Sequence, residues 1–587
     1  MPMTVVERIK KISAVLMKPL LKNSRFFIVM FCIGLLSVMV VHRGMRHISV
    51  FELFFETYLL TALVSCFPRW LSNITKGVCY VLAYVLGIVD MFVFYRLDFP
   101  LGPAFLRLCL QTNKQEASEA IQSYVTWDSI MSPVLLFLVI LALHLLSYRI
   151  NIKEFRIPHK LNNDILLCLA PLLLFSGALS LKNEWFIVRN MLAYDGDDME
   201  RQAQLPYDGG FYLPIYRFLY ASKAMNIDEL KIRRLIDNSS RVKVGRCAYT
   251  VPNIVLIVGE SYNRHHSSLY GYPLKTTPLQ EELAKKDELI AFTNVISPAN
   301  NTSQSFHLAF SLYATGCEGQ WESYPLLLQL FKQSGYNVTF ITNQYVNDIK
   351  AVIWDYNGSR FMNTPELSER QFSHRNTKKH PYDMGLLEDY DSLKRFETDH
   401  NLTVFHTYGL HFMYDVRYPK DQRRFYPRHY KRPDLSEFDV DNLSHYDNAV
   451  LYNDKVLAEI VKRFADRDAV VIFMPDHGEM VYDNCDQYAR NLNPKTRNEI
   501  TQQFDIPFWI WCSPMFKEQH EELFEKIKKA RNLPFMTDNL DQLLVLLGGI
   551  STEYYRPEDN PLSEKYDKKR KRIIMDGIDY DKIIRQQ

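Results

Sequence analysis

Residues 469–479 read Ala-Val-Val-Ile-Phe-Met-Pro-Asp-His-Gly-Glu. The apolar first part is typical of a buried parallel strand, which Pro475 and Gly478 bring to an end. Asp476 and His477 follow this strand directly, at the edge where open α/β sheets bind their ligands. Both residue types bind metals, although an isolated pair is more often structural. The pair is stronger evidence for a metal site because other segments of the chain supply further candidate ligands.

Two other apolar runs end in groups of the same kind. The run 253–258 is rich in β-branched residues and leads to Glu260. The run 402–405 leads into His406 and, a few residues later, His411. Because the carboxyl ends of parallel strands meet in one crevice, we expect these side chains to converge with the Asp-His pair.

The segment that follows another predicted strand adds a hydroxyl group to these candidate residues. Residues 291–296 are predicted to form a strand, and the segment 297–303 that follows contains Thr302. Further strands are predicted at 338–342 and 507–511, with helices at 324–334 and 446–464. Alternation of this kind predicts an α/β domain with a mostly parallel central sheet, covered by helices on both faces and spanning 249–587.

The first third of the chain has a different character. Five apolar runs are each near the length that crosses a bilayer: 26–41, 48–67, 77–95, 130–147 and 165–181. Basic residues before the first run favour a cytoplasmic start, so five crossings leave the rest of the chain outside the cytoplasm. We therefore predict a five-helix transmembrane bundle over 1–183 and a membrane-surface linker with amphipathic helices over 184–248. Asp90, within the third run, is expected to pair inside the bundle.

Composition excludes some functions. The chain has 587 residues and a formal net charge of +2, which argues against a general nucleic-acid binder. Four cysteines lie in the soluble part, and an oxidising compartment permits two disulfides among them in any of three pairings. They are Cys247, Cys317, Cys485 and Cys512. No closely spaced cysteine pair indicates a structural zinc site.

Several motifs together resemble one family. Gly259-Glu260-Ser261 is followed at 268–278 by Ser-Leu-Tyr-Gly-Tyr-Pro-Leu-Lys-Thr-Thr-Pro. The remaining matching segments are Thr302 with Ser305, His-Thr-Tyr-Gly-Leu-His at 406–411, Tyr446-Asp447-Asn448 and Asp-His-Gly-Glu at 476–479. With the preceding apolar runs, this set resembles the lipopolysaccharide phosphoethanolamine transferases, which are membrane-anchored members of the alkaline phosphatase and sulfatase superfamily.

The resemblance implies a site and a reaction. It implies that the family's zinc ligands correspond to Glu260, Thr302, Asp476 and His477. It also implies that Thr302 is the nucleophile and that His411 contacts the phosphate. It implies one Zn²⁺ ion, with a second left open. It also implies a phosphatidylethanolamine donor, a lipopolysaccharide acceptor (lipid A or an inner-core sugar), and a monomer in a Gram-negative inner membrane with a periplasmic catalytic domain. The chemistry of zinc supports a threonine nucleophile, because zinc lowers the pKa of a threonine hydroxyl, which is otherwise a poor nucleophile.

The sequence departs from the family pattern in one place. Many members carry a further histidine beyond the Asp-His pair, whereas residues 481–503 contain none and offer only Arg490, Lys495 and Arg497 as positive side chains. Arg497 is our candidate for that phosphate contact, and Ser305 is a further substrate-binding candidate.

Two carboxylates in the second apolar run are further candidates. Glu52 and Glu56 lie four residues apart on one helix face, so they are candidates to receive the ammonium of an ethanolamine head group. Carboxylates that simply lie at a helix end near the membrane surface are the plainer alternative.

Two other functions stay open from sequence. A phosphoglycerol transferase of the same superfamily would use phosphatidylglycerol instead. A membrane regulator could have kept the fold and lost the metal, although the intact residues Glu260, Thr302, Asp476 and His477 argue against it. A sulfatase is disfavoured, because Cys512-Ser513-Pro514 lacks the required arginine and comes too late in the chain.

Overall fold

The computed structural model describes most of the chain: residues 5–41, 46–97, 101–102, 105–106, 109, 133–149, 159–192, 211–344, 360–491, 494–575 and 577–585. The chain divides into two compact units. The first, here called the helical unit, comprises Met1–Cys109 and Lys114–Glu229. The second, the sheet unit, comprises Leu110–Asn113 and Leu230–Gln587.

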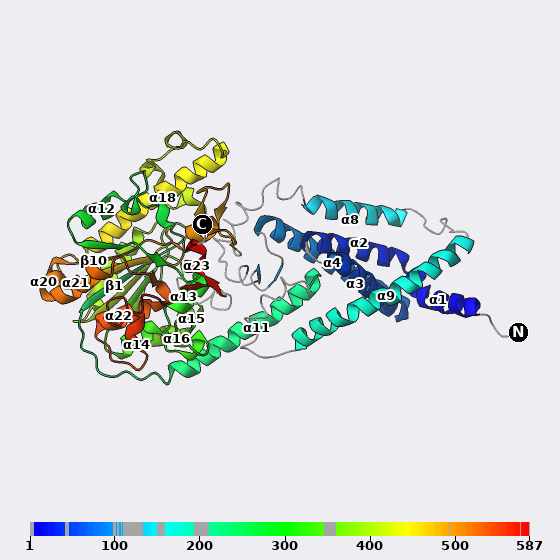
Figure 1. The fold of residues 1–587 in the computed structure, drawn as a ribbon, viewed down its shortest axis with the longest axis horizontal. Coiled ribbons are helices and arrows are strands. Elements are labelled where there is room, and N and C mark those ends of the chain that lie inside the picture. Colours follow the sequence, from blue (N-terminus) through cyan, green and yellow to red (C-terminus); the bar gives the residue numbers. More distant parts are fainter. Residues whose placement is uncertain are drawn as a thin grey trace. The chain divides into compact units, whose positions relative to one another are not determined.

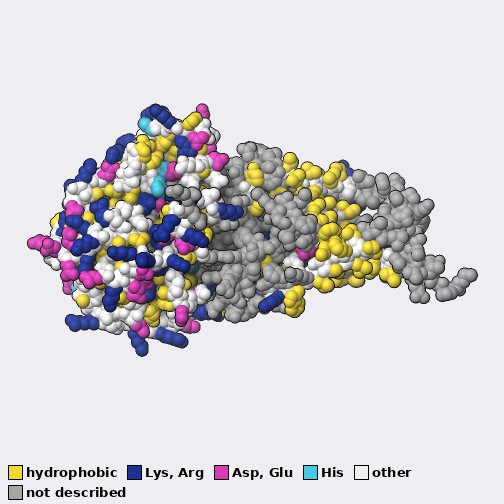
Figure 2. Space-filling view, viewed as in Figure 1, with side chains coloured by type: hydrophobic (Ala, Val, Ile, Leu, Met, Phe, Trp, Pro, Cys, Tyr) yellow, Lys and Arg dark blue, Asp and Glu magenta, His cyan; other side chains and the backbone are white. Residues whose placement is uncertain are grey.

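The helical unit is built from long helices, most of which coincide with apolar stretches of sequence (Figure 1). They are α1 (Val5–Lys22), α2 (Ser24–Val41), α3 (Arg46–Cys66), α4 (Arg69–Leu97), α8 (Pro133–Arg149), α9 (His159–Leu192) and the start of α11 (Pro214–Ser239). Large apolar side chains such as Val81 and Leu143 are each 62% exposed. Figure 2 shows hydrophobic side chains gathered over this unit, whereas charged side chains cover the sheet unit.

Each of the five predicted runs overlaps a helix, but a count of five spans is not confirmed. Among the described residues, Ser49–Cys66 and Arg69–Tyr95 are long and apolar enough to cross a membrane. A third span results if α1 and α2 act together, although the chain bends by 78° between them. The apolar parts of α8 and α9 are shorter than a span requires.

Asp90 pairs inside the helical unit, as its place in an apolar run predicts. Arg217 on α11 forms an ion pair with it, with Nη2 and Oδ2 2.6 Å apart and both side chains buried. Arg217 also donates to the carbonyl oxygens of Phe211 and Leu101. A buried charge is tolerated only when it is paired and hydrogen-bonded in this way.

The structure describes only part of the predicted linker over 184–248. Helix α9 continues to Leu192, beyond the expected end of the bundle, and α11 covers 214–239. Residues 193–210 of the linker lie outside the described residues.

The sheet unit contains a seven-stranded central sheet with the order β2-β10-β7-β1-β6-β4-β5. Its strands are β1 (Asn253–Gly259), β2 (Leu289–Phe292), β4 (Asn337–Thr342), β5 (His374–Arg375), β6 (Asn401–His406), β7 (Ala469–Pro475) and β10 (Phe508–Cys512). Strands β7, β1, β6, β4 and β5 run parallel to one another. The sheet is mixed, because β10 runs antiparallel to both β7 and β2.

The segment 291–296 does not form the single strand that its composition predicts. It divides into the end of β2 and a short β3 (Val295–Ile296), which leaves the central sheet and pairs in parallel with β11 (Phe535–Met536). This break redirects the chain just before residues 297–302, and so it decides where Thr302 lies.

Helices cover both faces of the sheet (Figure 1). On one face, alternate β1 residues such as Val255 and Ile257 pack against α17 (Gly385–Leu393) and α18 (Glu437–Lys462). On the other, Ile254 and Leu256 pack against α14 (Leu327–Gln333) and α22 (Leu540–Gly548). A strand that is apolar on both faces is therefore buried on both faces, which is the expected pattern for parallel sheets.

No disulfide forms among the soluble cysteines. Cys247, Cys317, Cys485 and Cys512 are all free, and Cys512 is buried in β10.

Candidate metal and nucleophile site

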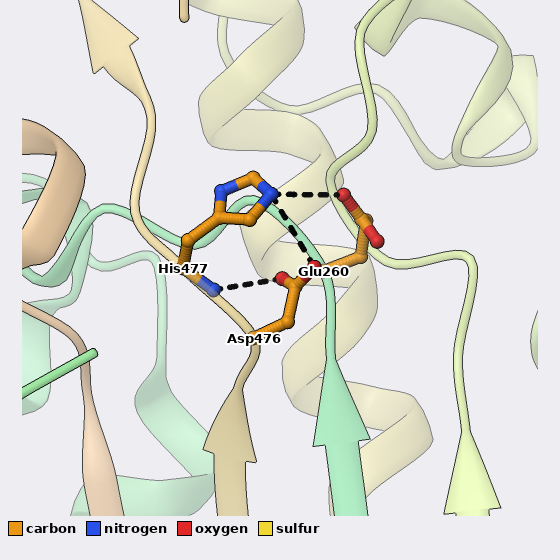
Figure 3. A group of neighbouring side chains, drawn as sticks. All are labelled: Glu260, Asp476 and His477. Carbon is orange, nitrogen blue, oxygen red and sulfur yellow. Dashed lines mark hydrogen bonds and ion pairs between the residues drawn. The ribbon is translucent and has the colours of Figure 1, made fainter. Parts of the chain in front are cut away.

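Two adjacent strands bring a glutamate and an aspartate together. In the β1–β7 register, Gly259 lies opposite Pro475, so the next residues, Glu260 and Asp476, leave the sheet side by side. His477 follows, and all three side chains are almost completely buried. Their ligand atoms lie within 4.8 Å of one another (Figure 3). Sequence reasoning predicted this convergence, and the geometry can hold a metal ion.

The surroundings of His477 prepare one ring nitrogen for coordination. Nδ1 lies 2.7 Å from the carbonyl oxygen of Gly478, which can only accept a hydrogen bond. The proton therefore resides on Nδ1, and Nε2 carries the lone pair, which accepts a hydrogen bond from Arg490 Nη1 at 3.2 Å. Nε2 lies 3.5 Å from Glu260 Oε1 and 3.3 Å from Asp476 Oδ2, so it points into the group.

The two carboxylates carry an electrostatic cost in the absence of a cation. Burial and the neighbouring Asp476 raise the pKa of Glu260 to about 7. Burial also raises the pKa of Asp476, whose Oδ2 atom is buried with no hydrogen-bond partner. Burial and Arg490 lower the pKa of His477 to about 4, so its imidazole is neutral. Two crowded carboxylates and a neutral imidazole suit a divalent cation.

Thr302 reaches this group from a helix start. It is the first residue of α13 (Thr302–Ala309), whose cap is Asn301, because the Asn301 side chain accepts a hydrogen bond from Gln304 N. Thr302 Oγ1 donates to Glu260 Oε2 at 3.4 Å. The nucleophile candidate thus lies against one of the predicted ligands, at a helix end that favours negative charge.

The loop after β6 closes over Glu260. Leu410 N donates to the Glu260 carbonyl oxygen at 3.1 Å. Gly409 has a φ of +52°, and a Cβ there would lie 2.9 Å from Glu260 N. A glycine is therefore needed for both the backbone conformation and the close approach.

His411 lies beside this site, within the electrostatic reach of Arg490 and His477. It is buried, and burial together with Arg490 holds the pKa of its imidazole well below the usual range. The imidazole is therefore neutral, and its Nδ1 atom is buried with no hydrogen-bond partner. It can offer an N–H donor to an anion that enters the site.

Two site residues escaped sequence reasoning. Gln344 Nε2 donates to Glu260 Oε2 at 3.1 Å and to the carbonyl oxygen of Thr407 at 2.8 Å. Arg490 Nη1 donates to His477 Nε2 at 3.2 Å, and its charge also acts on Glu260 and His411. No sequence pattern marks Gln344. Arg490 was one of three cations noted after the Asp-His pair, from which Arg497 was chosen as the candidate for the phosphate contact.

The remaining candidates lie in other surroundings. Ser305 is buried one turn after Thr302, and its hydroxyl donates to the Ala299 carbonyl oxygen at 3.3 Å. Arg497 is exposed at the first residue of α19 (Arg497–Phe504). Glu52 and Glu56 lie on α3 of the helical unit. Their roles in substrate binding stay predictions.

The chain is similar to several known proteins. Residues 252–543 match the model of the Sulfatase family. Phosphoethanolamine transferase EptC of Escherichia coli O18:K1:H7 (strain RS218 / NMEC) is 29% identical over 277 residues, covering 46% of this chain and 47% of that protein. Phosphoethanolamine transferase EptA of Helicobacter pylori (strain ATCC 700392 / 26695) is 27% identical over 336 residues, covering 56% and 59%. The chain thus spans about half the length of the curated relatives it matches.

A solved membrane protein shares the fold. The integral membrane protein lipooligosaccharide phosphoethanolamine transferase A (EptA) from Neisseria meningitidis superposes with a TM-score of 0.59 at 19% identity. The match covers 92% of this chain and 98% of that one.

Proposed function

We propose that this chain, a sulfatase-family protein related to the phosphoethanolamine transferases, moves phosphoethanolamine from phosphatidylethanolamine to lipopolysaccharide. The acceptor is a group on lipid A or on an inner-core sugar. The reaction has two steps and passes through a phosphoethanolamine-threonine intermediate on Thr302, with release of diacylglycerol in the first step. The protein works as a multi-pass monomer of a Gram-negative inner membrane, with the sheet unit in the periplasm.

One observation carries the proposal. Thr302 Oγ1 donates to Glu260 Oε2 beside the buried group formed by Glu260, Asp476 and His477. A threonine at the start of a helix, next to two carboxylates, has no evident need for such a costly environment in a purely structural role. A covalent nucleophile does need it.

The residues present fit a zinc ion. Glu260 and Asp476 offer carboxylate oxygens, His477 offers Nε2, and Thr302 offers a hydroxyl, a set that resembles catalytic rather than structural zinc sites. The buried, unpaired Oδ2 of Asp476 is an atom that such an ion would satisfy. When bound, zinc would lower the pKa of the threonine hydroxyl and offset charge on the phosphoryl group.

The other residues position and neutralise the phosphate. The Thr302 hydroxyl, on the first residue of α13, attacks the donor phosphorus. His411 supplies a neutral N–H donor, and Arg490 supplies a permanent positive charge for the phosphoryl oxygens. A hydroxyl or phosphate of the acceptor then attacks the same phosphorus and frees Thr302.

Intact mass tests this function directly. Detergent-purified protein is incubated with phosphatidylethanolamine beside the Thr302→Ala variant. We expect wild type alone to gain one phosphoethanolamine unit and to release diacylglycerol. Thr302→Ser serves as the matched control, because it keeps the attacking hydroxyl and should still form the adduct.

Other outcomes have defined meanings. An adduct that persists in Thr302→Ala would place the nucleophile elsewhere and refute this mechanism. An adduct that forms with phosphatidylglycerol but not with phosphatidylethanolamine would favour the phosphoglycerol transferase. Fully active transfer to lipopolysaccharide by Thr302→Ala would end the covalent proposal.

A further inference from the structure

A buried carboxylate outside the metal group holds the loop that leads to His411. Asp383 lies two residues before α17 and is only 8% exposed. Its Oδ1 atom accepts a hydrogen bond from Tyr408 N at 2.8 Å, and its Oδ2 atom accepts one from Gly409 N at 2.8 Å. The Asn343 side chain donates a further hydrogen bond to Oδ1, at 2.9 Å. Both carboxylate oxygens of Asp383 therefore fix the backbone of this loop.

The residues on either side of this contact are fixed by the strand that leads to the metal group. Thr407 N donates to the Val258 carbonyl oxygen at 3.0 Å, and Leu410 N donates to the Glu260 carbonyl oxygen at 3.1 Å. The two N–H groups between them are those that Asp383 accepts. Four consecutive N–H groups thus have defined acceptors, which leaves the backbone little freedom before the next residue.

Aromatic contacts extend this support to the ring of His411. The rings of Tyr408 and His411 are stacked, with centroids 5.3 Å apart and an angle of 18° between their planes. The guanidinium of Arg417, a buried residue, lies 3.9 Å from the centroid of the Tyr408 ring. The Phe412 ring also contacts the imidazole, at 4.5 Å between centroids. The orientation of the imidazole therefore depends on Tyr408, whose backbone Asp383 holds.

The charge of Asp383 matters for these contacts. Burial raises the pKa of Asp383, but the loop N–H groups, Asn343 and the positive charge of Arg417 act in the opposite direction and favour the ionised form. An ionised carboxylate accepts hydrogen bonds at both oxygens, whereas an asparagine offers one oxygen and an NH₂ group that cannot accept. A neutral amide at this position would therefore lose one of the two loop contacts.

We propose that Asp383 is a positioning residue that acts through His411. It holds the imidazole in the orientation in which a ring nitrogen meets an oxygen of the phosphoryl group. The Nδ1 atom of His411 is buried with no hydrogen-bond partner, and a phosphoryl oxygen would supply one. This inference rests on the proposed function for the phosphoryl group, and it adds a residue that lies in none of the matching motifs.

Asp454 provides a matched control for an effect on folding alone. It is also buried, and its carboxylate accepts hydrogen bonds from two consecutive backbone N–H groups, of Leu279 and Gln280, and from the Gln280 side-chain amide. These contacts fix the start of α12 (Pro278–Lys285) and not the loop that leads to His411. Asp383→Asn and Asp454→Asn should both lower the midpoint of urea unfolding, but only Asp383→Asn should alter the phosphate site.

Binding of inorganic phosphate measures this positioning without any transfer step. The full chain is loaded with zinc, and phosphate is titrated by calorimetry. We expect Asp383→Asn to weaken phosphate binding about tenfold, the scale of one hydrogen bond to a charged group. Asp454→Asn should leave the phosphate affinity within about twofold of wild type, because distant sites act independently.

A double-mutant cycle separates positioning from a general loosening of the fold. His411→Ala removes the imidazole that Asp383 holds, so Asp383→Asn should change the phosphate affinity of that variant by less than about twofold. Arg417→Lys gives a second route, because it keeps the charge but removes the planar group from the Tyr408 ring. It should weaken phosphate binding about threefold, the scale of a partly lost cation–π contact.

The outcomes distinguish this inference from the proposed function. An equal loss from Asp383→Asn with and without His411 would overturn it, even if wild type forms the Thr302 adduct. Zinc-loaded wild type that binds no phosphate would overturn it too. If Asp383→Asn does not fold, an unchanged phosphate affinity in Arg417→Lys overturns it instead. Coupling between Asp383 and His411, with no adduct from phosphatidylethanolamine, would support the positioning role and refute the transfer mechanism.

Discussion

Arg490 Nη1 donates a hydrogen bond to His477 Nε2 across 3.2 Å. This is the nitrogen that carries the lone pair, because Nδ1 donates to the Gly478 carbonyl oxygen. The guanidinium therefore lies beside the atoms that would hold a metal. An arginine differs from a histidine in that its charge does not depend on pH near neutrality.

Replacement of Arg490 should impair transfer more than metal binding. We expect Arg490→Ala to lower turnover about 10- to 100-fold, the loss of one or two charge-assisted hydrogen bonds to phosphoryl oxygens. Zinc content, measured by elemental analysis, should stay near the wild-type value because Arg490 is not a ligand. Arg497→Ala is the companion variant. A larger loss from Arg497→Ala than from Arg490→Ala would show that the sequence-based candidate was the correct one.

Metal removal should inactivate and destabilise the sheet unit. Chelation is expected to abolish adduct formation and to lower the unfolding temperature by several degrees, since a ligand at 100 times its Kd contributes about 2.7 kcal/mol. Asp476→Asn should bind zinc at least tenfold more weakly, because it removes a buried charge that no hydrogen bond to Oδ2 compensates. Calorimetric titration of chelated protein with zinc measures the zinc affinity of wild type and of Asp476→Asn. Wild-type activity that survives full chelation would contradict the assignment.

Gly409 offers a test of how the loop supports Glu260. Gly409→Ala and Gly271→Ala both place a side chain at a positive φ, which costs about 1–2 kcal/mol. Only Gly409→Ala also meets a close neighbour, since no heavy atom lies within 4 Å of a Cβ at Gly271. We expect Gly409→Ala to cost about 1–3 kcal/mol more in chemical denaturation and to weaken zinc binding as well. Equal effects of the two variants would show that the approach to Glu260 is not restrictive.

His266 should give stability a defined pH dependence. Its Nδ1 lies 2.6 Å from Asp447 Oδ1, and its Nε2 lies 3.4 Å from Asp483 Oδ1. Burial lowers the pKa of His266, but the two carboxylates outweigh burial and raise it to about 10. A raised folded-state pKa contributes stability that is fully present below the unfolded value of about 6.5 and is lost as pH rises through about 10.

The variant His266→Gln tests this dependence. At pH 6 it should cost about 3–5 kcal/mol, the scale of a broken buried ion pair. The difference from wild type should shrink steadily between about pH 6.5 and pH 10. His429→Gln, at an exposed position, is the control. A difference that stays constant over this range, measured by urea unfolding, would mean that His266 is not charged in the folded protein.

Much of the sheet and its edge follows from local sequence. The runs that became β1, β6 and β7 are mostly apolar on both faces, which is the pattern of a strand buried on both faces of a sheet. Since parallel strands end at one edge, Glu260, Asp476 and His477 had to lie near one another once these strands paired. The hydroxyl of Thr302 was assigned through motif resemblance and not through strand geometry.

The sequence alone did not determine the direction and division of some strands. The run at 507–511 looks like any other buried strand, yet β10 is antiparallel to β7. The run 291–296 is continuous in composition but splits between two sheets. Hydrophobic pattern reports burial, whereas strand direction and breaks depend on which partners the chain finds in three dimensions.

Only tertiary structure decided which polar side chains complete the sites. Arg490 and Gln344 stand in no periodic pattern. Gln344 reaches Glu260 across 84 residues of sequence, and Arg490 reaches His477 from a position 13 residues further along the chain. Local sequence records the apolar pattern that folds the chain, because burial acts on every residue of a strand or helix. A single polar contact acts on one atom pair, and its partner is fixed only when the whole fold has formed.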